Sequence, residues 1–398
     1  MMYGEAVRES RRNTEEMKKQ TTIHRLAGHM TAFFKKETVL CVAAVLAALS
    51  VIFVPPDRTY LEYPDYRVLA LLFCLMLVVA GLQSIGLFRY LGFRLLRGIR
   101  NTFQLNCLLV ALPFAASMFI TNDVALITFV PFAVMTLTMA GQQKLLVPVV
   151  VLQTIGANLG SMLTPVGNPQ NLYLYTVFDL SMASFLRDML PLTLLSLLLL
   201  AAAVWFQGRT LLAVQTLEMP KAPDRKKLAA YGILFLVCLT CVLRLLSWPV
   251  MLAVLMLAVL LIDRSLFRSV DYFLLLTFVC FFLFIGNMER IPAVASLMRE
   301  LIDGRELPVS VGLSQVISNV PAAILLSGFT EKVRSLLYGV NIGGLGTLIA
   351  SLASVISYRI YGGSKEAQKG KYMKTFTVYN VIFLVVLYVA AAALLSPS

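Results

Sequence analysis

The sequence has few charged residues and almost no histidine. Charged residues make up 14% of the 398 positions, against about a quarter in soluble domains. The only histidines, His24 and His29, lie outside the apolar runs, so neither a histidine metal centre nor an intramembrane histidine relay is expected. Ser-His pairs, His-Glu-x-x-His motifs and paired intramembrane aspartates are also missing. The sequence therefore argues against an enzyme and predicts no bound cofactor.

Neither the cysteine spacing nor the basic net charge indicates a specific function. All six cysteines lie in apolar segments, and the Cys238-Leu-Thr-Cys241 spacing inside one of them indicates packing. The net charge is +13, but the basic residues lie in the N-terminal tail and in certain loops, with no helix-turn-helix, zinc finger or RNA-binding motif. This distribution is typical of a membrane protein that obeys the positive-inside rule and does not bind nucleic acid.

Long apolar runs dominate what is present. Hydrophobic residues make up 59% of the chain, and the mean hydropathy is +0.81. Runs such as 192–206 are almost continuously apolar. These features predict an all-α polytopic protein of the plasma or inner membrane. We expect nine spans, near residues 38–54, 69–88, 145–175, 189–206, 228–246, 248–262, 272–288, 336–358 and 376–395.

Loop charge predicts the orientation and the division of the chain. Loops 89–101, 207–227 and 359–375 are rich in Lys and Arg, which places them and the N-terminus in the cytoplasm and the C-terminus outside. The basic segment around 89–100 has helical spacing and is expected to lie on the inner leaflet. The expected units are a basic cytoplasmic tail (1–37), an N-terminal repeat (38–206), a cytoplasmic linker (207–227) and a C-terminal repeat (228–398).

Two polar breaks interrupt the apolar runs. They are Thr121-Asn122-Asp123, flanked by about 104–120 and 124–140, and Ser318-Asn319-Val320-Pro321, flanked by about 308–317 and 322–329. Polar groups in lipid need a hydrated or protein-lined cavity. The second pair of segments is too short to cross, so it is expected to form a re-entrant hairpin. For 104–140, a hairpin and a double crossing both fit the loop charges.

The two halves of the chain resemble each other. Asn122 matches Asn319, and the motif around Gly156-Ala-Asn158-Leu-Gly160 matches Gly339-Val-Asn341-Ile-Gly343. A match between Asp65-Tyr66 and Asp271-Tyr272 precedes both. An odd number of spans separates the matching segments, so the repeats are expected to be inverted. Inverted repeats with broken helices are typical of alternating-access transporters.

A proline- and glycine-rich stretch follows the first Gly-x-Asn-x-Gly motif. Thr164-Pro165-Val-Gly167-Asn168 is expected to unwind the helix and free backbone carbonyls. Such oxygens suit Na⁺, and exposed helix N-termini suit an anionic substrate. The alternative is that the small residues only permit close helix packing.

Asp123 is the one carboxylate expected deep in an apolar stretch. Burying its charge is costly without a cation or a proton. It is therefore expected to bind the coupling cation, Na⁺ or H⁺, or to carry a proton during transport. The alternative role is an N-cap for a helix that starts at Val124.

The two tips resemble the paired Ser-Asn-Thr-type hairpin tips of the ion transporter superfamily, which includes citrate and dicarboxylate transporters, arsenite permeases and sodium/proton antiporters. The stretch from Gly156 to Asn171 is similar to that superfamily's unwound helix. The resemblance implies a homodimeric elevator-type carrier in which two hairpins and two unwound helices move. It also implies that Asn122 and Asn319 face substrate and cations, and that Asn158 and Asn341 help form cation sites.

The resemblance predicts a cation-coupled carrier of a small anion such as citrate or a dicarboxylate. Asp123 and Val320-Pro321 stand where the dicarboxylate branch has Thr, which keeps arsenite or antimonite efflux, or another proton-coupled efflux, as the alternative. The expected substrate-binding residues are Thr121, Asn122, Asp123, Ser318, Asn319, Val320, Pro321, Thr164, Pro165, Gly167 and Asn168. The expected cation-binding residues are Asn122, Asp123, Gly156, Asn158, Gly160, Asn319, Gly339, Asn341 and Gly343.

Overall fold

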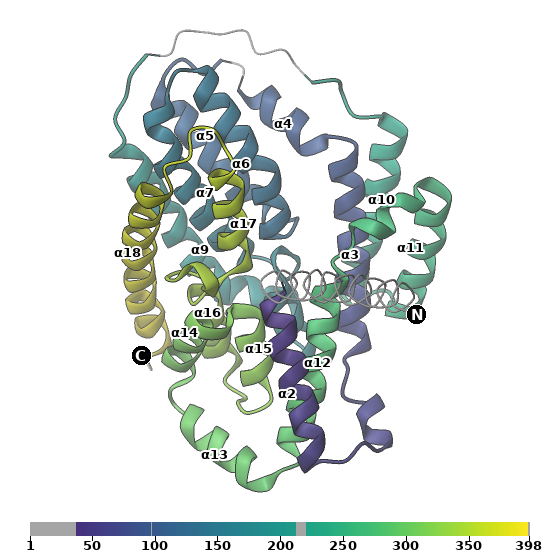
Figure 1. The fold of residues 1–398 in the computed structure, drawn as a ribbon. Coiled ribbons are helices and arrows are strands. Elements are labelled where there is room, and N and C mark those ends of the chain that lie inside the picture. The colour runs from purple at the N-terminus through teal and green to yellow at the C-terminus, as the bar shows by residue number, and fades with distance from the viewer. Residues whose placement is uncertain (1–36, 97, 212–219, 397–398) are drawn as a thin grey trace, which may run out of the picture.

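The protein is helical in a computed structural model that describes residues 37–96, 98–211 and 220–396, and these residues form no sheet (Figure 1). The expected tail, to residue 36, and residues 212–219 of the expected linker lie outside the described part. The first half contains α2 (Thr38–Phe53), α3 (Tyr66–Ser84), α4 (Leu87–Leu95), α5 (Thr102–Ala116), α6 (Asn122–Met139), α7 (Leu146–Ser161), α8 (Pro169–Val177) and α9 (Met182–Trp205).

The second half contains nine further α-helices in the described residues. They are α10 (Arg225–Val242), α11 (Trp248–Ile262), α12 (Tyr272–Glu289), α13 (Pro292–Ile302), α14 (Glu306–Ile317), α15 (Asn319–Ser327), α16 (Val333–Ile342), α17 (Leu352–Gly362) and α18 (Lys369–Leu395), with α10 and α11 preceding the part that matches the first half. The prediction of an all-α polytopic protein is confirmed.

The order of elements from α3 to α9 recurs from α12 to α18. Each series has a long helix, a connecting helix, two helices that meet at a polar tip, a helix that ends at a break, a short helix and a final long helix. The connector α13 was not expected, because its region is rich in charged residues. Its apolar residues fall on one face, with Ala295 and Ile302 buried. Figure 1 shows the two connectors, α4 and α13, at opposite ends of the molecule.

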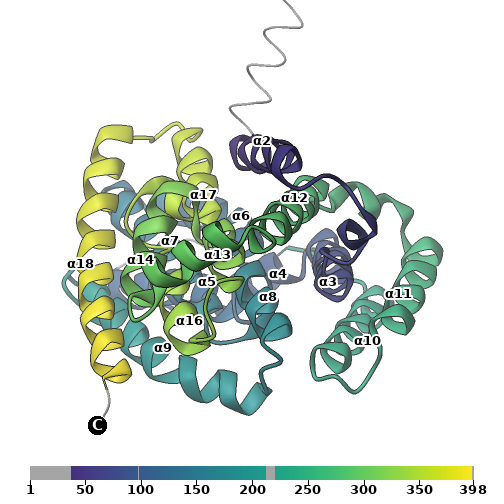
Figure 2. The ribbon, with the colours of Figure 1, turned by 90° about the horizontal axis from the view of Figure 1, so that it is seen from below.

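The helices form two groups, which we call the framework and the bundle. The framework is α2, α3, α10, α11 and α12, and the bundle is α5–α9 with α14–α18. Helices within each group pack closely, whereas α3 against α8 and α12 against α15 are contacts between the groups. Figure 2 shows α3, α10 and α11 on one side of the molecule and α7, α9, α14, α16 and α18 on the other. The connectors α4 and α13 join framework to bundle.

Packing in the framework depends on small side chains. A Cβ at Gly81 of α3 would lie 2.6 Å from the ring of Tyr231 of α10, so only glycine lets the two helices approach. Cys74 on α3 and Cys238 and Cys241 on α10 are free and fully buried. This environment agrees with the packing role expected for the cysteines.

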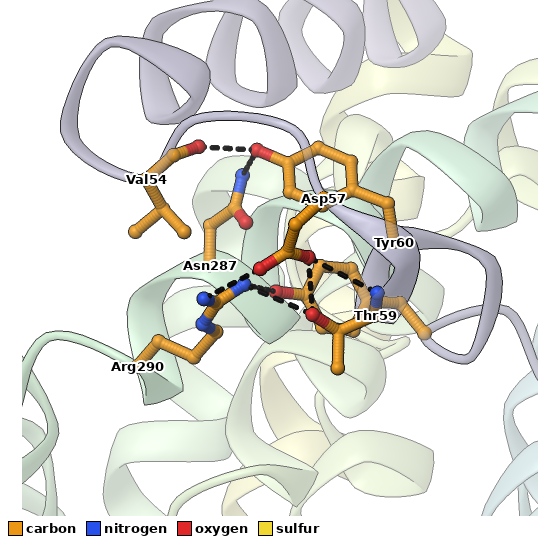
Figure 3. A network of polar contacts seen from close by, with 7 residues as sticks. Val54, Asp57, Thr59, Tyr60, Asn287 and Arg290 are labelled. Atoms are coloured by element: carbon orange, nitrogen blue, oxygen red, sulfur yellow. Dashed lines mark hydrogen bonds and ion pairs between the residues drawn. The ribbon is translucent and has the colours of Figure 1, made fainter.

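A polar network ties α2 to α12 (Figure 3). The buried Asn287 of α12 donates hydrogen bonds to Ser50 Oγ of α2 and to Tyr60 Oη, both at 2.8 Å. Tyr60 in turn donates to the carbonyl of Val54 at the end of α2. Because the side chain of Asn287 reaches both the helix and the turn after it, the network fixes α2 along α12.

An ion pair extends this network to the surface. Arg290 Nη2 lies 2.8 Å from Asp57 Oδ2, and Arg290 Nη1 donates to the hydroxyls of Thr59 and Tyr63 (Figure 3). The Arg290 guanidinium and, next, the Thr59 hydroxyl hold the pKa of Asp57 below its ordinary value. The charged form of Asp57 is thus favoured in the folded protein.

Six helical stretches in the described residues are long and apolar enough to cross a membrane: Arg58–Ser84, Asn122–Met139, Gln143–Ser161, Met182–Trp205, Tyr272–Glu289 and Lys369–Leu395. Shorter apolar helices lie at Thr38–Phe53, Thr102–Ala116 and Trp248–Ile262. The segments expected at 145–175 and 336–358 are each interrupted, because proline or glycine stands in their middle. The nine-span topology stays a prediction.

Candidate functional site

The first polar tip meets the middle of the bundle. Asn122, the first residue of α6, donates from Nδ2 to Oδ1 of Asn158 on α7 at 2.9 Å. Both side chains are buried. Thr121 precedes α6 as its N-cap residue, although its side chain makes no capping hydrogen bond. The tip therefore contacts α7 through an amide pair.

The second polar tip has a strained backbone. Ser318, between α14 and α15, has φ 75° and ψ 155°, a region that residues other than glycine rarely adopt. Its hydroxyl lies 3.3 Å from the carbonyl of Ala350. The next residue, Asn319, lies so close to Gly344 that a Cβ there would be 2.8 Å from Asn319 Nδ2. This tip therefore lies against the break that follows α16.

The break after α7 is closed by amides. Pro165 and Pro169 lack an N–H, which leaves nearby carbonyls without helical partners. Asn168 is the N-cap of α8, and its Oδ1 accepts from the Asn171 backbone N–H at 2.9 Å. Asn171 Nδ2 donates to the carbonyls of Ser161 and Met162 at 3.4 and 3.2 Å. The carbonyls expected to be free are therefore partly satisfied by Asn171.

The break after α16 is closed by Gln315, a residue not among the predicted site residues. Its Nε2 donates to the carbonyls of Gly343 and Leu345 at 2.8 and 2.9 Å, and its Oε1 accepts from the Thr347 backbone N–H at 2.8 Å. Gln315 lies on α14, three residues before the tip. A glutamine in an apolar segment was the signal that could have found it, because a buried amide needs partners.

Asn158 crosses from α7 to α17. Its Oδ1 accepts from Ser351 Oγ at 3.0 Å, in addition to the bond from Asn122. Its Nδ2 lies 3.5 Å from both Ser354 Oγ and the Gly344 carbonyl. Asn158 therefore joins the first tip to the start of α17.

Asn341 makes the corresponding crossing in the other direction. Its Oδ1 accepts from Asn168 Nδ2 at 3.2 Å. Its Nδ2 donates to Asn171 Oδ1 at 2.7 Å and to the Leu337 carbonyl at 2.8 Å. The two central asparagines thus bind the broken regions of opposite halves.

These partners correspond along the chain. The offset between the two central asparagines is 183 residues (341 − 158), and the same offset relates Asn168 to Ser351 (351 − 168) and Asn171 to Ser354 (354 − 171). Asn168 and Ser351 are the N-cap residues of α8 and α17. The halves therefore present equivalent positions with different chemistry, two amides in one and two hydroxyls in the other.

A cavity of about 370 Å³ lies between the framework and the bundle. Its apolar wall comes mainly from α3, with further side chains from α6, α8, α12 and α17. The N-terminal residues of α8 and α17, Pro169 and Leu352, border it. Its polar lining residues are Gln83, Ser84, Thr121, Asp123, Asn168, Ser269 and Asp271.

Charge in this cavity is entirely acidic among the described residues. Asp123 and Asp271 line it, and no Lys or Arg does. Asp123 lies in the first turn of α6, and its buried Oδ1 has no hydrogen-bond partner. The alternative role of Asp123 as an N-cap is wrong, because α6 begins one residue earlier, at Asn122, with Thr121 in the N-cap position.

A second cavity, of about 480 Å³, adjoins the first. It lies between α4 and α6, and Gln83 lines both cavities. Its polar lining consists of Gln83, Arg89 and Thr128, and the remaining lining is mostly apolar.

The predicted site residues take different positions. Thr121, Asp123 and Asn168 line the acidic cavity, whereas the residues of the second tip do not. The glycines lie at helix contacts: a Cβ at Gly160 would be 2.0 Å from the Phe114 carbonyl of α5, and one at Gly343 would be 2.6 Å from Ser314 Oγ of α14. A Cβ at Gly339 would lie 2.4 Å from Ser310 Cβ of α14, whereas one at Gly156 would lie at an ordinary 3.4 Å from the Val110 carbonyl of α5. Gly167 faces the Ser161 and Ser117 carbonyls. Thr164 is half-buried, and Pro165, Ser318, Asn319 and Pro321 are buried.

Comparisons with known proteins agree with this architecture. The citrate transporter family profile matches residues 30–334. An uncharacterized transporter of Methanocaldococcus jannaschii is 30% identical over 324 residues, covering 81% of this chain and 88% of that protein. The Escherichia coli inner membrane protein YbiR is 32% identical over 305 residues, covering 74% and 80%. The rice (Oryza sativa) silicon efflux transporter LSI3 is 34% identical over 170 residues, covering 40% and 33%.

Proposed function

This chain belongs to the citrate transporter family, and we propose that it is a proton-coupled carrier of a small, uncharged, hydroxylated solute. The protein is a multi-pass integral protein of the inner membrane. The observation that carries the proposal is the acidic cavity, which Asp123 and Asp271 line without a basic partner.

The charge of the cavity bears on the substrate. Two carboxylates repel a citrate or dicarboxylate anion and leave it without a counter-ion in a partly apolar site. A neutral hydroxylated acid, such as silicic or arsenous acid, can instead donate and accept hydrogen bonds with Asp123, Thr121 and Asn168. The similarity to a silicon efflux transporter over 170 residues supports this class of solute.

Hydrogen bonding bears on the coupling ion. Asn158 Oδ1 already accepts two hydrogen bonds, and the side-chain oxygens of Asn168, Asn171 and Asn341 each accept one. A sodium ion would have to displace several of these donors. Asp123 Oδ1, in contrast, is buried without a partner and needs a cation or a proton. We therefore favour H⁺ on Asp123 over Na⁺ at the asparagines.

An elevator movement of inverted repeats is the mechanism we propose. In this scheme the bundle slides along the framework, with α4 and α13 as hinged connections. The recurring order of elements, the opposite placement of α4 and α13 (Figure 1) and the cavity between the two helix groups support it. The same proposal includes a re-entrant hairpin at 104–140 and a homodimer held together by the framework.

Citrate is the second candidate, and one observation favours it. The N-termini of α8 and α17 border the cavity at Pro169 and Leu352, and helix N-termini attract anions. The family to which the chain belongs is also one of citrate transporters. Under this alternative the helix ends would have to outweigh the two carboxylates.

Transport by purified protein in proteoliposomes tests the proposal. Silicic acid, arsenite and citrate are each offered with an imposed pH gradient and, separately, with a Na⁺ gradient. We expect pH-driven transport of a neutral acid that Asp123→Asn abolishes. The matched control is Asp65→Asn, which keeps an N-cap on α3 and leaves the cavity unchanged. Na⁺-driven citrate transport that survives in Asp123→Asn would overturn the proposal.

A further inference from the structure

Two helices from different groups end beside each other on residues with left-handed backbones. Asp179 follows α8 of the bundle with φ 53°, and Arg244 follows α10 of the framework with φ 64°. With Ser318 of the second tip, they complete the set of non-glycine residues with positive φ in the described chain. A left-handed backbone is unfavourable for a residue with a Cβ, so these positions need an explanation.

The end of α8 has the geometry in which glycine is normally found. The Asp179 N–H donates to the Thr176 carbonyl at 3.3 Å, and the Leu180 N–H donates to the Tyr175 carbonyl at 3.1 Å. This pair of bonds defines a Schellman motif, whose left-handed position is usually glycine. An aspartate stands there instead.

The end of α10 repeats the geometry. The Arg244 N–H donates to the Cys241 carbonyl at 3.0 Å, and the Leu245 N–H donates to the Thr240 carbonyl at 2.9 Å. Arginine lacks the short polar side chain that helps asparagine and aspartate tolerate this conformation. The contacts of the Arg244 side chain therefore have to offset the free-energy cost of its left-handed backbone.

The two side chains meet. Arg244 Nη1 lies 2.8 Å from Asp179 Oδ1 and also donates to the Asp179 carbonyl at 3.2 Å. The guanidinium lies 5.5 Å from the ring centroid of Tyr175 on α8, and the Tyr175 hydroxyl donates to the Val242 carbonyl on α10 at 3.1 Å. An exposed ion pair alone contributes little. Here one guanidinium binds a carboxylate, a helix C-terminal carbonyl and an aromatic ring together.

We propose that Asp179 and Arg244 form a latch that holds the bundle against the framework in this conformation, with Arg244 as its positioning residue. The latch joins α8 to α10 across the boundary along which the elevator movement would occur, so the inference rests on the proposed function. When the bundle slides, the contacts of Arg244 with Tyr175 and Asp179 must break. The latch therefore sets the population of this conformation.

Glycine substitutions separate the latch from the fold. Arg244→Gly and Asp179→Gly remove the pair but restore the residue that a Schellman motif prefers, so neither variant should unfold. Arg244→Ala keeps the left-handed strain and is the matched comparison. Arg244→Lys keeps the charge and should restore part of the latch, although it loses the planar fork that binds the carboxylate and carbonyl together.

Hydrogen–deuterium exchange of the full chain in detergent is the test, because it needs no substrate. In Arg244→Gly we expect about two- to five-fold faster exchange, the factor that corresponds to a partly exposed ion pair. The faster exchange should extend to α12 and α15, a separate contact between framework and bundle. Asp179→Gly should give the same pattern, and the double variant should add nothing.

Either of two results would overturn the latch: acceleration confined to 173–181 and 240–246, or effects of the two glycine variants that simply add. The exchange pattern is independent of transport. Loss of transport in proteoliposomes with the expected exchange response would contradict the proposed function alone, and transport with no remote exchange response would contradict the latch alone.

Discussion

Asn158 hydrogen-bonds to the short helix that follows Asn341 in the chain, and Asn341 hydrogen-bonds to the short helix that follows Asn158. Asn158 on α7 accepts from Ser351 at the start of α17, and Asn341 on α16 accepts from Asn168 at the start of α8. Each half therefore adds a hydrogen bond to the broken region of the other, beside the bonds that close each break within its own half. The core of the site is shared between the halves, and a change in one asparagine is felt in the opposite repeat.

Loss of Asn341 should destabilise the protein strongly. In Asn341→Ala, the side chains of Asn168 and Asn171 each lose a buried partner. Each unsatisfied group costs about 1–3 kcal/mol. We expect a clear fall in the thermal unfolding temperature of the detergent-solubilised protein. The matched control is Asn380→Ala, since the buried Asn380 side chain donates only to a carbonyl of its own helix, that of Phe376, and its Oδ1 has no partner. Equal losses in both variants would contradict the shared network.

Alanine at the close helix contacts should also be costly. A Cβ at Gly160 would lie 2.0 Å from a backbone carbonyl that cannot move aside. Overpacking of this kind costs about 1–3 kcal/mol. In Gly312→Ala of α14 the new methyl meets open space, so this variant should be neutral or slightly more stable. Unfolding temperatures of the two variants decide the matter, and a stable Gly160→Ala protein would show that α5 and α7 are not packed as described.

Gln153 should be coupled to Pro113. Pro113 lacks the N–H that would bond to the Leu109 carbonyl four residues earlier, and Gln153 Nε2 of α7 donates to that carbonyl at 2.8 Å. Gln153→Leu should therefore destabilise the protein by about 1–3 kcal/mol. In a Pro113→Ala background, where α5 can satisfy Leu109 itself, the loss should shrink. A double-mutant cycle of unfolding free energies measures the coupling, and additive effects would refute it.

The Asp57–Arg290 pair should give a pH-dependent contribution to stability. The pKa of Asp57 is lowered from 3.8 by Arg290 and Thr59, so its charged form stabilises the fold. This contribution to stability is fully present at pH values above the ordinary pKa of 3.8, and it is lost as the pH falls through the lowered pKa of Asp57 in the folded protein. The unfolding temperature of Asp57→Asn should lie below that of the wild type at neutral pH, and the difference should close in acid. A difference that persists unchanged at low pH would assign the effect to another contact.

Sequence patterns predicted most of the architecture. The polar tips, the two breaks and the repeat followed from Asn, Pro and Gly in apolar runs, because lipid makes such residues costly without a structural reason. The structure confirms the helical class and brings Asn122 to Asn158 as an amide pair. The inverted orientation and the ligand roles stay predictions.

Other features could not be read from the chain. The pairing of Asn341 with Asn171, and the closure of the second break by Gln315, depend on which helices meet in three dimensions. Helix α13 was not predicted, because the charged residues of its segment obscured the apolar residues on one of its faces. The acidic cavity was missed because Asp271 lies 148 residues from Asp123 (271 − 123) and looks like an ordinary helix cap.

The framework also sets the order in which the protein can assemble. Helix α2 of the first half packs on α12, and α3 packs on α10 and α11. Both early helices therefore leave the ribosome long before their partners are made, and their matching faces must wait in the bilayer or against insertion factors. The first half alone should not reach a native packing. Docking of α2 is therefore a late event in biogenesis, and a chain truncated before α12 lacks the helix on which α2 packs.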